Sequence, residues 1–159
     1  MPHGHPMLLV DEVGPGPDAD SAVSFKNITF NEPCYSGVDS AAALDQLAYP
    51  LSLLVESFGQ GAGLLLARRG FLADTQANTA VVFGEFSGID IVGQAYPGER
   101  LRHEVRLTQC QGMLAVLSGS SYVGERAIAH FGPIWLVLVV AVALSKSRNV
   151  LVSETGNSR

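Results

Sequence analysis

An ionisable carboxylate lies inside an otherwise apolar stretch of this chain, at Glu56 in the run Leu53-Leu54-Val55-Glu56-Ser57-Phe58. Gln60 follows four residues later, on the same side of any helix that forms here. A carboxylate in apolar surroundings must find a partner, shift its pKa upward, or line a cleft. Two interpretations stay open on these residues alone: a structural carboxylate held by backbone amides or an arginine, and a catalytic acid or base.

The stretch around Glu56 predicts one long helix. Apolar residues recur at helical spacing from Tyr49 to Ala67, Pro50 stands at a tolerated first-turn position, and Arg68-Arg69-Gly70 ends the pattern. Because this helix is apolar nearly all round, we expect it in the middle of the fold, covered by a curved sheet.

Strand-like runs flank the helix on both sides. They span residues 7–13, 21–30, 80–88, 101–109, 113–123 and 127–144, with turns at 14–18, 95–99 and 124–125, and a bulge or bend expected at Gly132-Pro133. Strands, one buried helix and then antiparallel strands predict an α+β architecture with the sheet wrapped on the helix. We expect one domain over residues 1–144 and a polar tail over 145–159.

Composition narrows the possible functions and locations. A hydrophobic content of 47%, a charged content of 16% and a net charge of −5 describe a globular chain and argue against non-specific binding of nucleic acid. Cys34 and Cys110 fit no metal or disulfide spacing, so we expect no metal, no cofactor and a reducing cytoplasm. The start lacks a secretory signal, and the apolar run 134–144 is too short for a membrane helix of about 20 residues, which favours a buried strand and no membrane.

Four segments, in their order and spacing, resemble the bacterial 3-hydroxyacyl-(acyl-carrier-protein) dehydratases of the hot-dog fold. They are Pro2–Val13, Lys26–Pro33, Leu53–Gln60 and Tyr96–Leu101. The resemblance covers about residues 2–144 and implies that fold, loss of water from a 3-hydroxyacyl chain carried on acyl-carrier protein, and an active site at a dimer interface. It implies a catalytic role for Glu56 and a supporting role for Gln60.

The chain departs from the family at the second catalytic position. The family places a histidine in the loop before the helix, and Val38 stands there in this sequence. Asp39, Asp45 or Tyr35 on the same loop is one possible replacement, and binding of acyl chains without reaction is another. We favour a third, a heterodimer with a related hot-dog chain that carries the histidine, as in polyketide pathways where one subunit departs from the catalytic pattern. The chain's own histidines lie elsewhere and are expected to be structural: His3, His5, His103 and His130.

Further residues are expected to contact the substrate or its carrier. Val38, Tyr49, Leu51 and Gln60 are predicted around the acyl group. An acyl-carrier protein is acidic, so basic residues should receive it, and the candidates are Arg68, Arg69, Arg100 and Arg102. For Arg68-Arg69, complementation of the helix dipole is the alternative. Leu54 and Phe58 either line an acyl tunnel or belong to the core. Two other functions stay open: a non-catalytic binding subunit, and a hot-dog thioesterase that uses the helix carboxylate.

Overall fold

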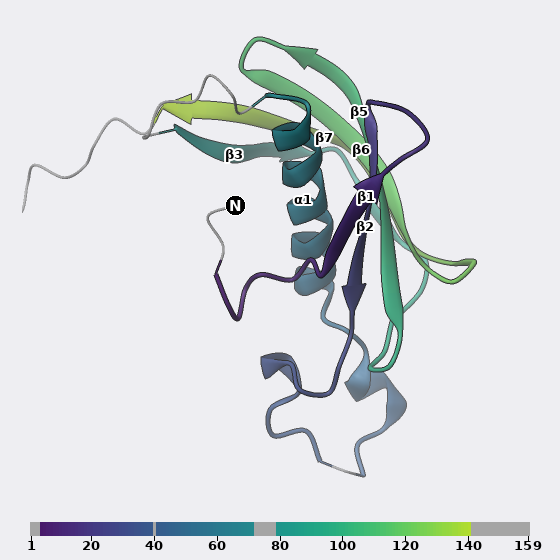
Figure 1. Ribbon diagram of the computed structural model, residues 1–159. Coiled ribbons are helices and arrows are strands. Elements are labelled where there is room, and N and C mark those ends of the chain that lie inside the picture. Colours follow the sequence, from purple (N-terminus) through teal and green to yellow (C-terminus); the bar gives the residue numbers. More distant parts are fainter. Residues whose placement is uncertain (1–3, 40, 72–78, 141–159) are drawn as a thin grey trace, which may run out of the picture.

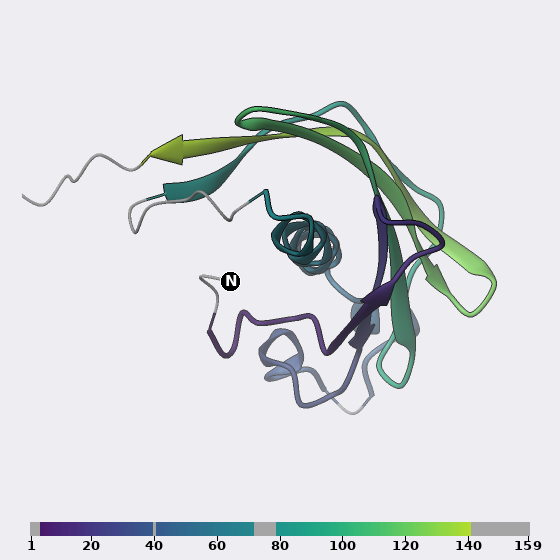
Figure 2. The same ribbon diagram turned by 45° about the horizontal axis from the view of Figure 1, so that its top comes forward.

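A single antiparallel sheet curves around one long helix, α1 (Leu51–Arg68), in the computed structural model (Figures 1 and 2). The structure describes residues 4–39, 41–71 and 79–140, except the side chains of 79–83, 86 and 138–140. Its strands are β1 (Glu12–Pro15), β2 (Ser21–Asn27), β3 (Thr79–Phe86), β4 (Ile89–Ile91), β5 (Arg100–Gln111), β6 (Leu114–Val123) and β7 (Arg126–Val140). The spatial order is β1-β2-β5-β6-β7-β3, with β4 also pairing with β7. Two short 3-10 helices, η1 (Pro33–Tyr35) and η2 (Leu44–Leu47), lie beyond the N-terminal end of α1. The predicted hot-dog fold is confirmed.

Alternation along β5 explains which side of the sheet meets the helix. Leu101, His103 and Val105 are buried, whereas the intervening positions, from Arg100 to Arg106, are exposed or half-buried. Side chains alternate between the two faces of a strand, so one face of β5 packs on α1 and the other faces outward. The position of His103 is therefore fixed by this period of two.

The predicted bulge in the last strand is confirmed. Between the pairs Leu117↔Ile134 and Gly119↔Phe131, two residue steps on β6 correspond to three on β7. The extra residue lies at Gly132-Pro133, where proline has no amide hydrogen for the ladder. β3 pairs with β7 on one side of the bulge and β4 on the other, so the bulge separates two partners of the same strand.

Several predicted strand boundaries were wrong. β1 begins at Glu12 rather than Met7 and includes Gly14 and Pro15, which had been predicted as a turn. Residues 7–10 form no strand because the Gln60 side chain of α1 forms hydrogen bonds with the carbonyl of Met7 and the amides of Leu9 and Val10. β2 ends at Asn27, since the next amide, of Ile28, donates to the carbonyl of Glu99 in a turn. The short β4 was not predicted, and the expected strand residues 141–144 and the tail lie outside the described residues.

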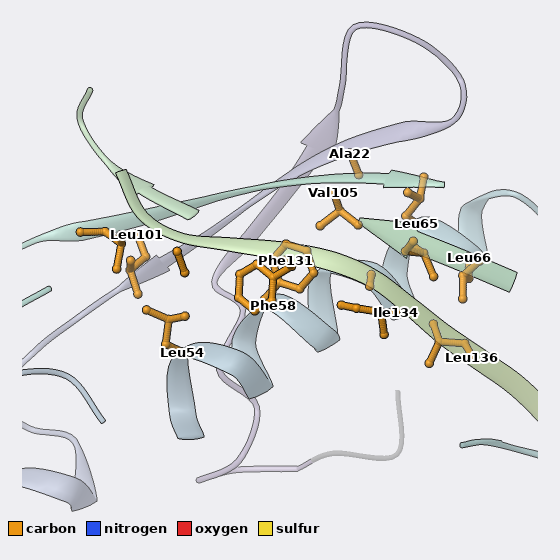
Figure 3. Close-up of a cluster of buried hydrophobic side chains, with 14 of the residues drawn as sticks. Ala22, Leu54, Phe58, Leu65, Leu66, Leu101, Val105, Phe131, Ile134 and Leu136 are labelled. Carbon is orange, nitrogen blue, oxygen red and sulfur yellow. The ribbon is translucent and has the colours of Figure 1, made fainter. Parts of the chain in front are cut away.

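The core lies between α1 and the concave face of the sheet. Phe58 is fully buried, and its ring stacks on Phe131 of β7 with centroids 3.8 Å apart (Figure 3). Leu54 is also buried in this cluster, facing Leu101. Leu54 and Phe58 therefore belong to the core of the subunit, where their packing stabilises the fold by roughly 1.5–3 kcal/mol per side chain.

By length and composition alone, Leu44–Arg68 is long and apolar enough to cross a membrane. The run 134–144, singled out from the sequence, is instead part of β7 as far as Val140. The core helix of a globular protein passes the same length test, and half of the apolar 18-residue window within Leu44–Arg68 is buried inside this structure. The sheet around α1 accounts for that burial (Figure 2).

Candidate active site

Glu56 lies on the half-buried side of α1, turned away from the core residues that face the sheet. Its Oε1 accepts a hydrogen bond of 2.8 Å from Nε2 of Gln60, one turn later. This contact is expected from the four-residue spacing of Glu56 and Gln60 in the sequence, because residues four apart are neighbours on a helix surface. The carboxylate is thus oriented by its own helix while it stays at the edge of the core.

Gln60 also fastens the N-terminal segment, residues 4–11, onto α1. Its Oε1 accepts from the amides of Leu9 (2.9 Å) and Val10 (3.4 Å), and its Nε2 donates to the carbonyl of Met7 (2.7 Å). With the bond to Glu56, both donors and both acceptor positions of the amide are used. Gln60 therefore positions Glu56 and the N-terminal segment, and its predicted contact with substrate would require one of these bonds to break.

Replacing Gln60 by leucine should release the N-terminal segment. The change leaves the buried amide of Leu9 without its acceptor, which costs about 1–3 kcal/mol of stability. Hydrogen exchange followed by mass spectrometry should show faster exchange in residues 4–11 and little change in β6. Gln46→Leu is the matched control, since Gln46 is exposed and its side chain accepts a hydrogen bond from the nearby amide of Ala43. Unchanged exchange at Leu9 and Val10 would contradict the role given to Gln60.

A buried hydrogen-bonded chain lies on the other side of α1, against the sheet. His103 of β5 is fully buried, with its Nε2 2.9 Å from Oγ of Ser57 on α1 and its Nδ1 2.6 Å from Oγ of Ser121 on β6. The Ser57 hydroxyl donates to the carbonyl of Leu54, so it accepts from Nε2–H, and Nδ1 accepts from the Ser121 hydroxyl. The ring is neutral, and all its polar atoms are paired.

The sequence indicated only an ordinary strand residue at His103. The available signal was its place between Leu101 and Val105, which puts position 103 on the buried face. Nothing in the sequence indicated the two serines, because one lies on the helix and the other on a neighbouring strand. Burial lowers the pKa of His103 from 6.5 to about 3.

This lowered pKa predicts a loss of stability in mild acid. The unfolded chain binds a proton at His103 as the pH falls below 6.5, and the folded chain does not until about 3, so the stability present above 6.5 is lost progressively toward 3. We expect the free energy of unfolding to fall by about 2 kcal/mol from this group between about pH 7 and about pH 5. Urea denaturation of the wild type and of His103→Leu at both pH values isolates this difference. The exposed His130, replaced by glutamine, is the control that should leave the fall unchanged.

The predicted substrate contacts in and after the loop before α1 differ in exposure. Val38 follows η1 and is 37% exposed, and Leu51, in the first turn of α1, is 51% exposed. Tyr49 is instead buried, and its amide donates to the carbonyl of Ala95. Burial and the nearby Glu32 raise the pKa of Tyr49, so its hydroxyl stays protonated at neutral pH. Of the predicted substrate contacts, Val38 and Leu51 are accessible in this subunit and Tyr49 is not.

The candidates to replace the histidine differ in their surroundings. Tyr35 is buried, and burial raises its pKa, so it cannot act as a base near neutral pH. Asp39 and Asp45 are exposed, and Asp39 accepts a hydrogen bond from the amide of Ala41 within its own turn. All three belong to the segment beyond the N-terminal end of α1 (Figure 1). The Tyr35 hydroxyl therefore stays protonated at neutral pH.

The four candidate arginines form two separate groups. Arg68 donates to the carbonyl of Ser21 (2.6 Å), at the first residue of β2, whereas Arg100 is paired in register with Asn27, at the last. Six residue steps of a strand separate the two ends by about 20 Å. Ion pairs join Arg69 to Asp20, Arg100 to Glu12 and Arg102 to Glu104. The arginines therefore do not make one continuous basic surface, and three of them have acidic partners.

No group of three histidine, cysteine, aspartate or glutamate side chains that would suit a metal ion occurs among the residues described. Cys34 is partly buried and Cys110 is exposed, and neither forms a disulfide.

The sequence is similar to known acyl-carrier-protein dehydratases. A family model described as a FabA-like domain matches residues 1–131. The 3-hydroxyacyl-[acyl-carrier-protein] dehydratase FabZ of Aliarcobacter butzleri is 30% identical over 133 residues, which are 82% of this chain and 86% of that protein. FabZ of Helicobacter pylori strain Shi470 is 32% identical over 134 residues, 82% of this chain and 80% of the relative.

Solved structures show the same fold at lower identity. The dehydratase heterocomplex ApeI:P from Xenorhabdus doucetiae aligns with a TM-score of 0.67 and 13% identity, covering 87% of this chain and 88% of that one. A hypothetical thioesterase protein with coenzyme A from Streptococcus pneumoniae aligns with a TM-score of 0.57 and 10% identity, covering 82% of this chain and 86% of that one. At these identities the likeness establishes the fold alone.

Proposed function

Because the chain belongs to the FabA-like domain family, we propose that it is a dehydratase-type subunit for 3-hydroxyacyl chains carried on acyl-carrier protein. It contributes Glu56 to an active site whose histidine comes from a related hot-dog partner. The position of Glu56 carries this proposal. Its carboxylate is half-buried and is oriented by Gln60, whose amide also binds the N-terminal segment. The sheet leaves one side of α1 uncovered (Figure 2).

Dehydration of a 3-hydroxyacyl thioester needs two groups that handle protons. The bond between the α-carbon and its proton breaks, its electrons form the new double bond, and the bond from carbon 3 to oxygen breaks as the hydroxyl leaves as water. One group takes the α-proton and the other delivers a proton to the leaving oxygen. Glu56 is one member of this pair, and nothing at Val38 can serve as the other, because a valine side chain carries no proton donor or acceptor.

Exposed apolar side chains around the start of α1 support a subunit partner. Large hydrophobic residues are exposed in the N-terminal segment, the loop and the first turn of the helix: Met7, Leu8, Phe30, Val38, Leu44 and Leu51. Apolar side chains that gather on one surface are typical of protein–protein contacts, and these six are exposed and available to such a contact. The fold is shared with a dehydratase heterocomplex, and this similarity favours a partner of the same fold over an unrelated one.

The proposal is tested by measuring dehydration with and without the partner. The chain is purified alone and together with a hot-dog protein that carries the histidine, and each sample receives a 3-hydroxyacyl chain on acyl-carrier protein. Mass spectrometry follows the loss of one water molecule per acyl chain. We expect the chain alone to be slower by a factor of about 10² to 10⁴, the usual contribution of a general acid or base. Equal rates with and without the partner would contradict the shared site.

A non-catalytic binding subunit is the second candidate, and Val38 is the observation that favours it. In that case the complex would dehydrate its substrate through the partner's residues alone. Replacement of Glu56 would then change stability or assembly and leave turnover intact. A thioesterase activity would release free acid from the same substrate, and the same mass measurement detects that product.

A further inference from the structure

We propose that the Ser57–His103–Ser121 chain positions Glu56, by fixing the rotation of α1 about its own axis. The inference rests on the proposed role of Glu56, and it adds residues that do not touch the substrate. Each link is a hydrogen bond between fully buried atoms on three different elements, α1, β5 and β6.

The Ser57–His103–Ser121 hydrogen-bonded group cannot act on substrate directly. Ser57 and His103 form a pair that resembles a nucleophile and its base, but both are fully buried, and the Ser57 hydroxyl donates to Leu54 of its own helix. A nucleophile needs access to the acyl carbon. The pair must therefore work through its neighbours, and Glu56 is the residue adjacent to Ser57.

The surface of α1 that meets the sheet carries both apolar contacts and hydrogen bonds. Gly61 of α1 is buried where the helix backbone approaches β2, and a β-carbon there would lie 2.3 Å from Oγ of Ser24. Apolar packing, including the stack of Phe58 on Phe131, holds α1 against the sheet, and the bonds of Ser57 act beside it. Hydrogen bonds have narrow distance and angle limits, and a fully satisfied buried network selects one arrangement.

The direction of Glu56 follows from the position of Ser57. Consecutive residues of an α-helix are about 100° apart around the axis, so a Ser57 held to β5 and β6 turns Glu56 away from the sheet. On that other side, Gln60 holds Glu56 and the N-terminal segment. Glu56 is thus fixed between two sets of hydrogen bonds, one to the sheet and one to the segment.

The test removes the hydrogen bonds and keeps the core filled. The triple variant Ser57→Ala/His103→Leu/Ser121→Ala replaces every polar member by an apolar group of similar or smaller size. Such complete replacements are often neutral for stability, whereas His103→Leu alone removes the partner of the buried Ser121 hydroxyl, while Ser57 keeps its bond to Leu54. Ser24→Ala is the matched control, a buried serine that also faces α1 but has no hydrogen-bond partner for its hydroxyl among the described residues.

Two readouts separate positioning from a structural role. Carbon-13 NMR of the chain without partner follows the signal of the Glu56 carboxyl. The dehydration assay with the partner gives kcat and KM. We expect the triple variant to fold, to change the carbon-13 signal of the Glu56 carboxyl, and to lower kcat about tenfold at unchanged KM. Ser24→Ala should change neither readout.

Two results would overturn the inference. One is a folded triple variant with the wild-type Glu56 signal and kcat. The second result comes from His103→Gln, which is used if the triple variant does not fold. The glutamine amide can donate to Ser57 and accept from Ser121. If His103→Gln disturbs the Glu56 signal as much as His103→Leu, the hydrogen bonds do not position Glu56. Because the signal is measured without a partner, failure of the proposed dehydration leaves this test valid.

Discussion

The complex with Glu56→Gln should lose dehydration activity by a factor of about 10² to 10⁴ in kcat while the protein stays folded. The substituted amide has nearly the same shape as the carboxyl group, and its oxygen can still accept the hydrogen bond from Nε2 of Gln60. What it loses is the ability to carry a proton at the reacting atoms. The rate is measured by mass spectrometry on the partnered complex, and the fold by thermal unfolding.

A matched carboxylate on the opposite side of the sheet provides the control. Glu104 lies on β5 and pairs with Arg102 on the outer face. Glu104→Gln removes the same charge far from α1, so kcat should remain within about twofold, because exposed ion pairs contribute only about 0–1 kcal/mol. Full activity of the Glu56→Gln complex, with a rate equal to that of Glu104→Gln, would remove Glu56 from the catalytic pair and favour the binding subunit.

Gly119→Ala should destabilise the fold by about 3 kcal/mol or more, a cost at the upper end of that for overpacking a core. A β-carbon at Gly119 would lie 2.1 Å from the carbonyl oxygen of Glu104 and 2.9 Å from two ring carbons of Phe58. The oxygen belongs to the backbone of β5, and the ring is stacked on Phe131, so neither can move without separating paired strands or breaking the central stack.

Chemical denaturation of Gly119→Ala beside Gly14→Ala checks this expectation. Gly14 is also a strand glycine, in β1, but a β-carbon there meets no atom within 4 Å. We expect Gly14→Ala to change the free energy of unfolding by less than about 1 kcal/mol, because only the backbone entropy differs. If the two variants unfold at the same denaturant concentration, the close approach of β6 to Phe58 is not a constraint on the fold.

Local sequence patterns were sufficient to predict the elements whose signals lie in neighbouring residues. The apolar run around Glu56 specified the central helix, and Gly132-Pro133 specified the bulge, because each signal depends only on neighbours in the sequence. The strand near the start was misplaced for the opposite reason. The apolar residues 7–10 have strand composition. However, the side chain of Gln60, some fifty positions later, forms hydrogen bonds with the amide of Leu9 and the carbonyl of Met7, so these groups do not pair with a strand.

The sequence by itself led to the proposal of which residues carry the chemistry: a carboxylate on an apolar helix, a glutamine one turn later, and a valine where the family resemblance places a histidine. Only the tertiary structure decided how these residues are held. The Ser57–His103–Ser121 hydrogen bonds join positions 46 and 18 residues apart, and Arg100 of β5 pairs with Glu12 of β1. Hydrogen bonds and ion pairs act over a few ångströms of space, so they depend on which distant segments the fold brings together, and sequence spacing does not contain that information.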